Sequence, residues 1–468
     1  MKVDPRWLPR AALILWLSAI FTLYLAPTPQ KYEKADALAL LLLIPLFVRY
    51  RAQLSTLLSG SKPLIPLLVL MAYVALQAWV QGQESAAGMH YVQQLLYGCL
   101  PYLLFYVVFR HLATPGSDML LMAVLVIPGV VHLLYLYTDV FLGIWSGEIQ
   151  FMFSSKHGWL EYIKNAPRVG RRYVSMALLH LLSGGLLVAC RAKSARLRYV
   201  AWTLAGLSVL SIAVLDARAA YASVFIGALF LVCAVGLRKT WHSIKRFFQW
   251  HPVLKLLFVG VFVAAAALGH SAGKSRWVAM SYSLEWAVHD VFQAETPVSK
   301  RPYVDMDFWN APLEDVYKCY LSGQFRCRAD QSAYLRMAWL LEGARSLIVN
   351  PLGIGYSEDY MGRLWGVEGE SNKYQRIDSF LVEHIVSFGW PAIVLYGWFF
   401  WGIVAAMRHA VRAGQSSAAA IILCALLLAC VGRTFVDVFS EGLWRYMMAL
   451  MGVYYGLLHA KSAQPKKD

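Results

Sequence analysis

The sequence predicts an all-α, polytopic integral membrane protein with about twelve transmembrane helices and one large, partly helical loop before the last three. Of its 468 residues, 59% are hydrophobic and 15% are charged, so the chain is more apolar than a water-soluble domain. Apolar runs long enough to cross a hydrocarbon core of about 30 Å recur between short polar breaks. Basic residues gather in alternate breaks, as they do in proteins with several membrane spans.

Twelve apolar runs account for most of the chain. The first nine cover residues 11–27, 35–50, 63–81, 91–112, 117–143, 173–190, 199–215, 219–237 and 253–270. The last three cover residues 379–406, 416–434 and 438–459. The chain therefore divides into a first membrane domain (1–270), a loop (271–377) and a second membrane domain (378–468). The first run is long and no clear cleavage site follows it, so it is interpreted as an anchor and not as a signal peptide.

The positions of the basic residues predict the orientation. With a cytoplasmic N-terminus, one side of the membrane receives a long series of them: Lys2, Arg6, Arg10, Arg49, Arg51, Lys62, Arg191, Lys193, Arg196, Arg198, Arg238, Lys239, Lys245, Arg246, Arg408, Arg412, Lys461, Lys466 and Lys467. Cytoplasmic loops of membrane proteins carry this excess of lysine and arginine. We therefore expect both termini in the cytoplasm and the large loop in the periplasm, on the outer face of a bacterial inner membrane. The same distribution explains the net charge of +16, so no nucleic-acid partner is expected.

The seven cysteines fit this arrangement. Five lie in expected spans, where a thiol behaves as a small apolar side chain: Cys99, Cys190, Cys233, Cys424 and Cys430. Cys319 and Cys327 lie in the large loop, which would face the oxidising periplasm. We expect a disulfide between them, with two free thiols as the alternative. Their spacing comes without other metal ligands, so the sequence predicts no metal site.

Two helices are expected in the large loop. The first is predicted by apolar residues at helical spacing, and it would lie on the membrane surface: Trp277, Met280, Leu284, Val288 and Val291. The second covers 332–348 and ends before Pro351, because proline cannot continue a helix. The following helix is expected to begin near Asp378 and to bend near Gly389 as it enters the membrane.

Arginines on the outer side break the positive-inside pattern. Five of them lie at or near the outer ends of expected spans: Arg168, Arg171, Arg172, Arg218 and Arg433. Charges near the hydrocarbon are costly and usually functional. The planar guanidinium group suits a phosphate, so these arginines predict a binding site for the diphosphate of a membrane lipid. The alternative is that single arginines pair with the local acids Asp216 and Asp437, or extend to the interface.

Ionisable residues near the start of the tenth span are candidates for a general base. Asp378, Glu383 and His384 lie close to the outer boundary there. A base of tuned pKa could deprotonate an acceptor hydroxyl, and Asp378 is the first choice. The alternatives are a helix N-cap for Asp378 and a structural role for His384.

Three stretches, in order along the chain, resemble the bacterial O-antigen ligase and O-antigen polymerase superfamily of membrane glycosyltransferases. The first is Pro167-Arg-Val-Gly-Arg-Arg172, and the second is Asp216-Ala-Arg-Ala-Ala-Tyr221. The third begins at Arg336-Met-Ala-Trp339, continues through Asn350-Pro-Leu-Gly-Ile-Gly355 and reaches Asp378-Ser-Phe-Leu381, with Gly389 downstream. The large outer loop before the last three spans also resembles the superfamily.

The resemblance implies a GT-C-like fold and a reaction at the periplasmic face. In this reaction a glycan moves from an undecaprenyl diphosphate donor to a sugar hydroxyl on a second lipid-linked glycan, with no diffusible cofactor. The resemblance also implies a role for each candidate: Arg168, Arg171, Arg172 and Arg218 hold the diphosphate, Arg336 or Arg433 supports the site, and Asp378 or His384 activates the acceptor. A chain-length regulator protein would be a further partner.

The residue at position 378 favours the polymerases within this superfamily. The ligases usually carry His-Asn at the positions that align with Ile377 and Asp378. Ligation of finished glycans to lipid A core is the alternative. A transporter or flippase for lipid-linked glycans is the alternative of another class. It would carry its charges near the middle of spans and show repeat symmetry between the two halves, and neither is evident in the sequence.

Overall fold

A computed structural model describes fifteen segments of the chain. They are 7–25, 29–50, 62–81, 85–111, 117–146, 151–154, 158–162, 171–192, 194–214, 281–293, 331–356, 360–365, 380–414, 418–434 and 441–462, together with the single residues 229, 236, 252, 256, 260, 298, 301, 303 and 304. For some residues inside these segments, only the backbone is described.

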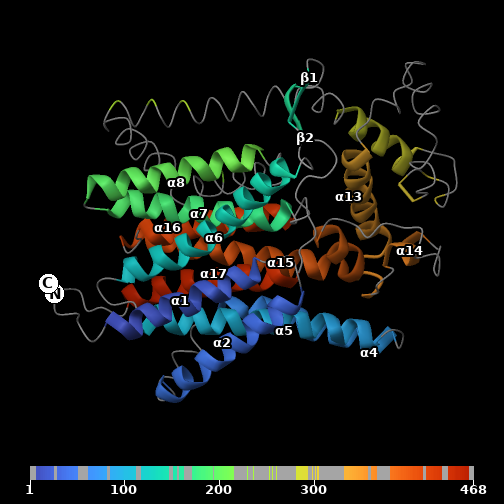
Figure 1. Cartoon of the computed structure of the whole chain (residues 1–468). Coiled ribbons are helices and arrows are strands. Elements are labelled where there is room, and N and C mark those ends of the chain that lie inside the picture. Colours follow the sequence, from blue (N-terminus) through green and yellow to red (C-terminus); the bar gives the residue numbers. More distant parts are fainter. Residues whose placement is uncertain are drawn as a thin grey trace.

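Long helices form a bundle in the described part of the chain (Figure 1). They are α1 (Trp7–Tyr24), α2 (Pro29–Tyr50), α4 (Ile65–Gln81), α5 (Ser85–His111), α6 (Ser117–Trp145), α7 (Arg171–Arg191), α8 (Ala195–Val214), α15 (Phe380–Arg412), α16 (Ala418–Thr434) and α17 (Glu441–Ser462), with the short 3-10 turn η2 (Lys62–Leu64) before α4. Each of these ten helices overlaps one expected span. The remaining two expected spans, 219–237 and 253–270, lie outside the described residues except for four single positions.

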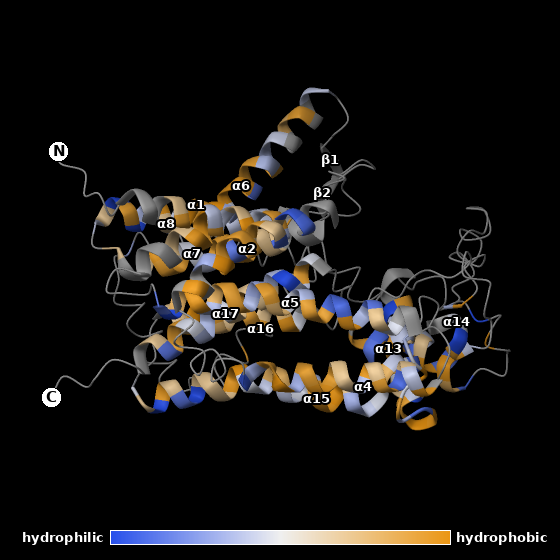
Figure 2. Cartoon of the chain, turned by 90° about the horizontal axis from the view of Figure 1, so that it is seen from below, coloured by the Kyte–Doolittle hydropathy of each residue, from blue (hydrophilic) through white to orange (hydrophobic). Residues whose placement is uncertain are grey.

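The bundle is that of a membrane-embedded protein. Three described helices, over Lys62–Val80, Gly88–His111 and Leu381–Arg412, are long and apolar enough to cross a membrane. Shorter apolar helices cover Ala12–Tyr24, Met122–Thr138, Met176–Ala189 and Ala419–Gly432. Figure 2 shows hydrophobic residues along most of the length of helices such as α6 and α15. The number of twelve spans remains a prediction.

Large apolar side chains also lie on the outside of the bundle. Trp79, near the end of α4, is 79% exposed, and Trp145, at the end of α6, is 82% exposed. On α15, Trp390, Trp398 and Trp401 are exposed as well. Such a surface is costly in water, whereas tryptophan is enriched at membrane interfaces. The outer face of the bundle is therefore suited to lipid.

Helices α5 and α17 run parallel and pack closely through glycines. A Cβ atom on Gly452 would collide with the carbonyl oxygen of Tyr102, and one on Gly456 would come within 2.8 Å of the carbonyl oxygen of Tyr106. These contacts advance together along both helices, so the helices have the same direction. Glycines four residues apart allow this close approach of two membrane helices.

A smaller helical unit lies beyond one end of the bundle (Figure 1). It contains α13 (Gln331–Val349), α14 (Tyr360–Trp365) and a helical segment at 281–292. Its apolar core includes Trp286, Tyr334 and Trp339, and it extends to Val382 on α15. Trp286 and Tyr334 stack with ring centroids 4.1 Å apart.

The expectations for the two loop helices have different outcomes. Helix α13 confirms the helix expected at 332–348 and ends at Val349, directly before Asn350 and Pro351. The segment at 281–292 is helical, as expected, with Trp286 and Val291 buried and Leu284 44% exposed, and its placement on the membrane surface remains a prediction. The large indole buries more apolar area against Tyr334 than leucine could, so it turns the helix toward α13.

A short β-ribbon interrupts the helices of the described chain without changing its all-α class. Strands β1 (Phe151–Ser154) and β2 (Gly158–Tyr162) pair antiparallel, with Phe151 opposite Tyr162. Their aromatic residues favour strands, and Gly158 helps the chain to reverse. The ribbon follows α6 and lies at the same end of the bundle as α13 and α14 (Figure 1). Both polar segments of the described chain are therefore at one end.

Candidate functional site

Two helices carry predicted diphosphate-binding arginines at the end of the bundle that bears the ribbon and α13. Arg171 and Arg172 open α7, directly after the segment that contains the ribbon. Arg433 lies in the last turn of α16, which contacts α7. Because α16 returns from the far end of α15, its last turn is at the end where α15 begins. The backbone thus brings these three positions to one end of the bundle, while their side chains are outside the described part.

Several predicted residues lie outside the described residues altogether. They are Arg168, Arg218, Asp378, Cys319 and Cys327. Their roles, and the disulfide expected between the two cysteines, remain predictions. Arg336, Glu383 and His384 are the predicted residues whose side chains the structure describes, and Glu383 is partly buried on α15.

The turn after α13 docks on a kink in α15. Gly389 has φ 64° and ψ −149°, and its neighbour Trp390 donates its backbone N–H to the carbonyl of Pro351 at 2.9 Å. Gly355 donates to the carbonyl of Ser387 at 2.9 Å. The bend predicted near Gly389 is confirmed. It leaves carbonyl groups of α15 free to bind the turn, which a straight helix would not do.

Glycine is required on both sides of this contact. A Cβ atom on Gly353, which has φ 77°, would meet the backbone of Ser387, and one on Gly389 would meet the backbone of Pro351. Left-handed backbone conformations are also unfavourable for residues with a side chain. The stretch Asn350-Pro-Leu-Gly-Ile-Gly355 therefore requires glycine at position 353, because it packs the end of α13 directly against the backbone of α15.

Helix α4 holds the same turn from the membrane side. The Tyr73 hydroxyl donates to the carbonyl of Leu352 at 2.5 Å. The Gln77 amide donates to the carbonyls of Leu352 at 3.0 Å and Ser387 at 3.2 Å. Side-chain hydrogen bonds from one span thus fix the position of the turn and of the kink together.

His384 is packed inside this region. It is 2% exposed, and its Nε2 atom is hydrogen-bonded to the hydroxyl of Tyr91. That hydroxyl also lies 2.7 Å from the hydroxyl of Tyr396, and the ring of Phe388 is 5.7 Å from the imidazole. This setting resembles the structural alternative considered for His384. The role of His384 as a base remains a prediction. In that role, the hydroxyl of the acceptor glycan would have to reach the second ring nitrogen, Nδ1.

Arg336 carries a buried donor. Its side chain is partly buried on α13, between Leu335 and Met337 of the small helical unit. Among the described residues, no hydrogen-bond acceptor pairs with its buried Nε atom. A buried donor without a partner costs about 1–3 kcal/mol, and more when the group is charged. Such a group in a native structure calls for an explanation, and an anionic ligand would provide one.

An arginine that the sequence did not single out lies one turn inside the start of α17. Arg445 is 4% exposed, and its Nε atom is 3.0 Å from a carboxylate oxygen of Asp36 on α2. The hydroxyl of Tyr24 donates to the same carboxylate at 2.8 Å. The guanidinium group also lies over the ring of Tyr97, 5.2 Å from its centroid. The sequence did carry a signal for this pair, because Asp36 and Arg445 are opposite charges inside predicted spans. Intramembrane charges usually pair with one another.

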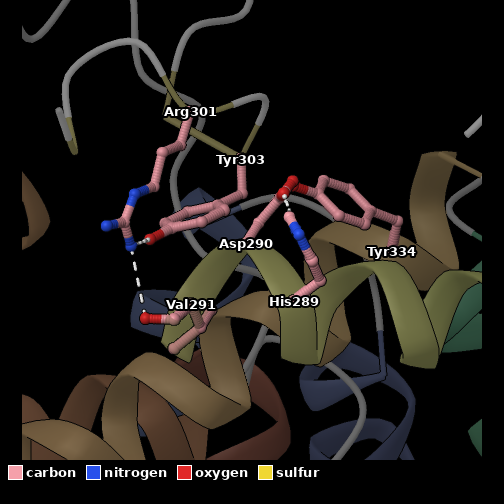
Figure 3. A network of polar contacts seen from close by, with 6 residues as sticks. All are labelled: His289, Asp290, Val291, Arg301, Tyr303 and Tyr334. Carbon is pink, nitrogen blue, oxygen red and sulfur yellow. Dashed lines mark hydrogen bonds and ion pairs between the residues drawn. The ribbon is translucent and has the colours of Figure 1, made fainter. Parts of the chain in front are cut away.

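Polar side chains also stabilise the small helical unit (Figure 3). Arg301 donates to the hydroxyl of Tyr303 at 3.1 Å and to the carbonyl of Val291 at 3.3 Å. The Tyr303 hydroxyl in turn donates to the carboxylate of Glu342 on α13 at 2.6 Å. Burial raises the pKa of Tyr303, and the nearby charge of Glu342 raises it further.

A second set of polar contacts joins the segment 281–292 to α13. Tyr334 donates to the carboxylate of Asp290 at 2.7 Å, and His289 lies 3.2 Å from the other oxygen of that carboxylate. These contacts connect the two helices around a buried acid. Within the described residues, His, Cys, Asp and Glu do not form a group of three or more suited to a metal ion.

The fold and these sites define a class: a polytopic helical membrane protein with a helical unit held against one end of its bundle. No family model, curated protein or solved structure matches the chain.

Proposed function

We propose that this protein is a membrane glycosyltransferase that polymerises oligosaccharide repeat units linked to undecaprenyl diphosphate. The reaction would take place at the periplasmic face of a bacterial inner membrane and yield O-antigen or an exopolysaccharide. The observation that carries the proposal is the buried Nε donor of Arg336, which has no partner among the described residues, on a helix joined to the end of the bundle where Arg171, Arg172 and Arg433 lie.

The chemistry needs positive charge at this end. An acceptor hydroxyl attacks the anomeric carbon of the donor glycan, the bond from that carbon to the diphosphate breaks, and the diphosphate leaves with the polyprenyl chain. Negative charge develops on the leaving group, and preplaced guanidinium groups stabilise it. The hydroxyl proton passes to a base, for which Asp378 is the first candidate and His384 the second. Arg168 and Arg218 complete the proposed diphosphate site.

The architecture suits a substrate that is half lipid and half glycan. The lipid-facing bundle would hold the polyprenyl chain, while the α13 unit lies beyond the bundle, where a glycan would extend. The turn at 350–355 fixes Arg336's helix relative to α15 through backbone hydrogen bonds. Fixed geometry of this kind is what an electrostatic site requires, because donors placed beforehand need no reorganisation during the reaction.

Product identification tests the proposal. Purified protein in lipid nanodiscs would be incubated with repeat units linked to undecaprenyl diphosphate, with and without lipid A core. We expect a ladder of longer lipid-linked glycans in both cases. Transfer only to lipid A core would identify a ligase instead. Movement of intact substrate across sealed vesicles without any new glycosidic bond would identify a flippase and contradict the proposal.

A further inference from the structure

Basic groups from three elements converge at the end of the bundle opposite to α13. Helix α5 ends with Arg110 and His111, and His459 lies near the end of α17. Lys62 of η2, just before α4, is close enough to His459 for an electrostatic interaction. Arg110 and His459 are partly buried, whereas Lys62 is exposed. This convergence does not follow from the proposed glycosyltransferase activity.

A tyrosine organises these groups. The guanidinium of Arg110 lies over the ring of Tyr106, 5.7 Å from its centroid, and donates a hydrogen bond to the Tyr106 hydroxyl. The same hydroxyl is 2.9 Å from Nδ1 of His459. A hydroxyl that accepts from arginine has its own proton to give to Nδ1, so Nε2 of the imidazole keeps a hydrogen and remains a donor. The side chains of α5 and α17 are thereby held in one arrangement.

The charge of this region is strongly positive in the sequence. The segments 62–64, 104–111 and 455–462 contain no aspartate or glutamate, and Lys461 adds a further basic residue. Asp118, near the start of α6, is the closest acid to Arg110 in the sequence. The positive-inside tendency accounts for basic residues at this end, but not for the contact of Arg110 on α5 and His459 on α17 with one hydroxyl, with Lys62 near His459.

We propose that Lys62, Arg110 and His459 form a binding site for the phosphate of an anionic phospholipid in the adjoining leaflet. Phosphate headgroups lie at the depth where membrane helices end, and basic pockets between helices recognise them. Arginine supplies paired donors for phosphate oxygens and lysine supplies a mobile charge. Phosphatidylglycerol has the required chemistry: one negative phosphodiester on a lipid that packs beside α5 and α17.

Lipid-dependent stability tests the site. The full chain would be placed in nanodiscs of phosphatidylcholine with increasing phosphatidylglycerol, and the thermal unfolding midpoint would be followed. We expect the midpoint to rise and then saturate for the wild type. Arg110→Gln should need about tenfold more phosphatidylglycerol for the same rise, because it removes one charge-assisted hydrogen bond. Lys62→Gln should shift the response in the same direction, and its exposed side chain makes misfolding a poor explanation.

Two controls decide the interpretation. Arg196→Gln removes an exposed arginine near the start of α8, outside the cluster, and should leave the phosphatidylglycerol response unchanged. Inorganic phosphate added to pure phosphatidylcholine nanodiscs should not reproduce the saturating rise. An equal effect of inorganic phosphate would overturn the assignment to a lipid. Equal responses of Arg110→Gln, Lys62→Gln and Arg196→Gln would show that the attraction is general and that no specific site exists.

Discussion

Arg336 is the residue whose substitution separates folding from activity most clearly. Its Nε atom is buried without a partner among the described residues, so this donor stabilises no contact within the described part of the fold. Arg336→Met should therefore leave the free energy of unfolding unchanged or raise it by up to about 1 kcal/mol, while polymer formation falls at least tenfold. Unfolding curves and product gels measure the two effects.

The control for Arg336 lies on the same helix. Arg345 is half-exposed and forms an ion pair at 3.5 Å with Glu342, three residues earlier. The Glu342 carboxylate is buried but also accepts from Tyr303, and the half-exposed Arg345 is screened by water, so Arg345 contributes little to stability. Arg345→Met should therefore keep polymer formation near the wild-type rate. Equal loss of activity in both variants would show that α13 merely needs its positive charge, and would remove the special role of Arg336.

Asp36 and Arg445 form a pair whose members depend on each other. Asp36→Ala would leave a buried guanidinium without its carboxylate, which costs about 3–5 kcal/mol in the free energy of unfolding. Replacing both residues by apolar ones, as in Asp36→Leu with Arg445→Met, should recover most of this loss. A double-mutant cycle from unfolding curves measures the coupling, and additive losses would contradict the pairing.

Tyr303 should give the small helical unit a dependence on alkaline pH. Because its pKa is raised in the folded protein, the protonated hydroxyl is favoured by folding. That contribution is complete below the unfolded pKa of about 10 and is lost as the pH rises above it. Tyr303→Phe should flatten this part of the stability curve above about pH 10. Thermal midpoints at each pH check it, and an unchanged slope would show that Tyr303 does not titrate differently on unfolding.

At the scale of elements, the contact between the turn and the kink should be sensitive to a single methyl group. Gly389→Ala places a Cβ atom against the backbone of Pro351 at a positive φ. We expect a loss of about 2 kcal/mol or more in the free energy of unfolding, together with loss of activity. Gly397→Ala on the same helix meets nothing within 4 Å and should be neutral or stabilising. Similar behaviour of the two variants would contradict the docked turn.

Local chemistry made some elements predictable. The end of α13 follows from Pro351, and the bend of α15 follows from a glycine and a proline two residues apart, because each acts on its own stretch of backbone. The β-ribbon was not predicted, because four or five residues with aromatic side chains carry too weak a signal between long apolar runs. Length and periodicity therefore identify helices far better than short strands.

Contacts between distant residues were not predictable. Asp36 meets Arg445 from the far end of the chain, and His384 is enclosed by Tyr91, which lies on another helix. Neither pairing follows from local spacing, since it depends on how the helices pack. The arginines expected on the outer side could be selected from the sequence, because the positive-inside rule assigns a side to each loop and uses only the order of the spans.

At the scale of the molecule, both described polar segments lie at one end of the bundle, and α1 begins at the other. The positive-inside pattern predicts that the first end faces the periplasm. A cysteine introduced at Ser146, in a variant without the native cysteines, should react with a membrane-impermeant maleimide in intact spheroplasts. One at Arg196 should react only after the membrane is opened. The reverse labelling would invert the orientation and, with it, the proposed reaction face.

Binding of undecaprenyl diphosphate to the purified protein tests the central claim most directly. The claim is that guanidinium groups at one end of the bundle bind a lipid diphosphate. Wild-type protein should bind this lipid more tightly than undecaprenol, which lacks the phosphates, and Arg171→Gln with Arg172→Gln should weaken the binding at least tenfold while the protein stays folded. Equal affinity for both lipids, or an affinity that the two substitutions leave unchanged, would contradict the account.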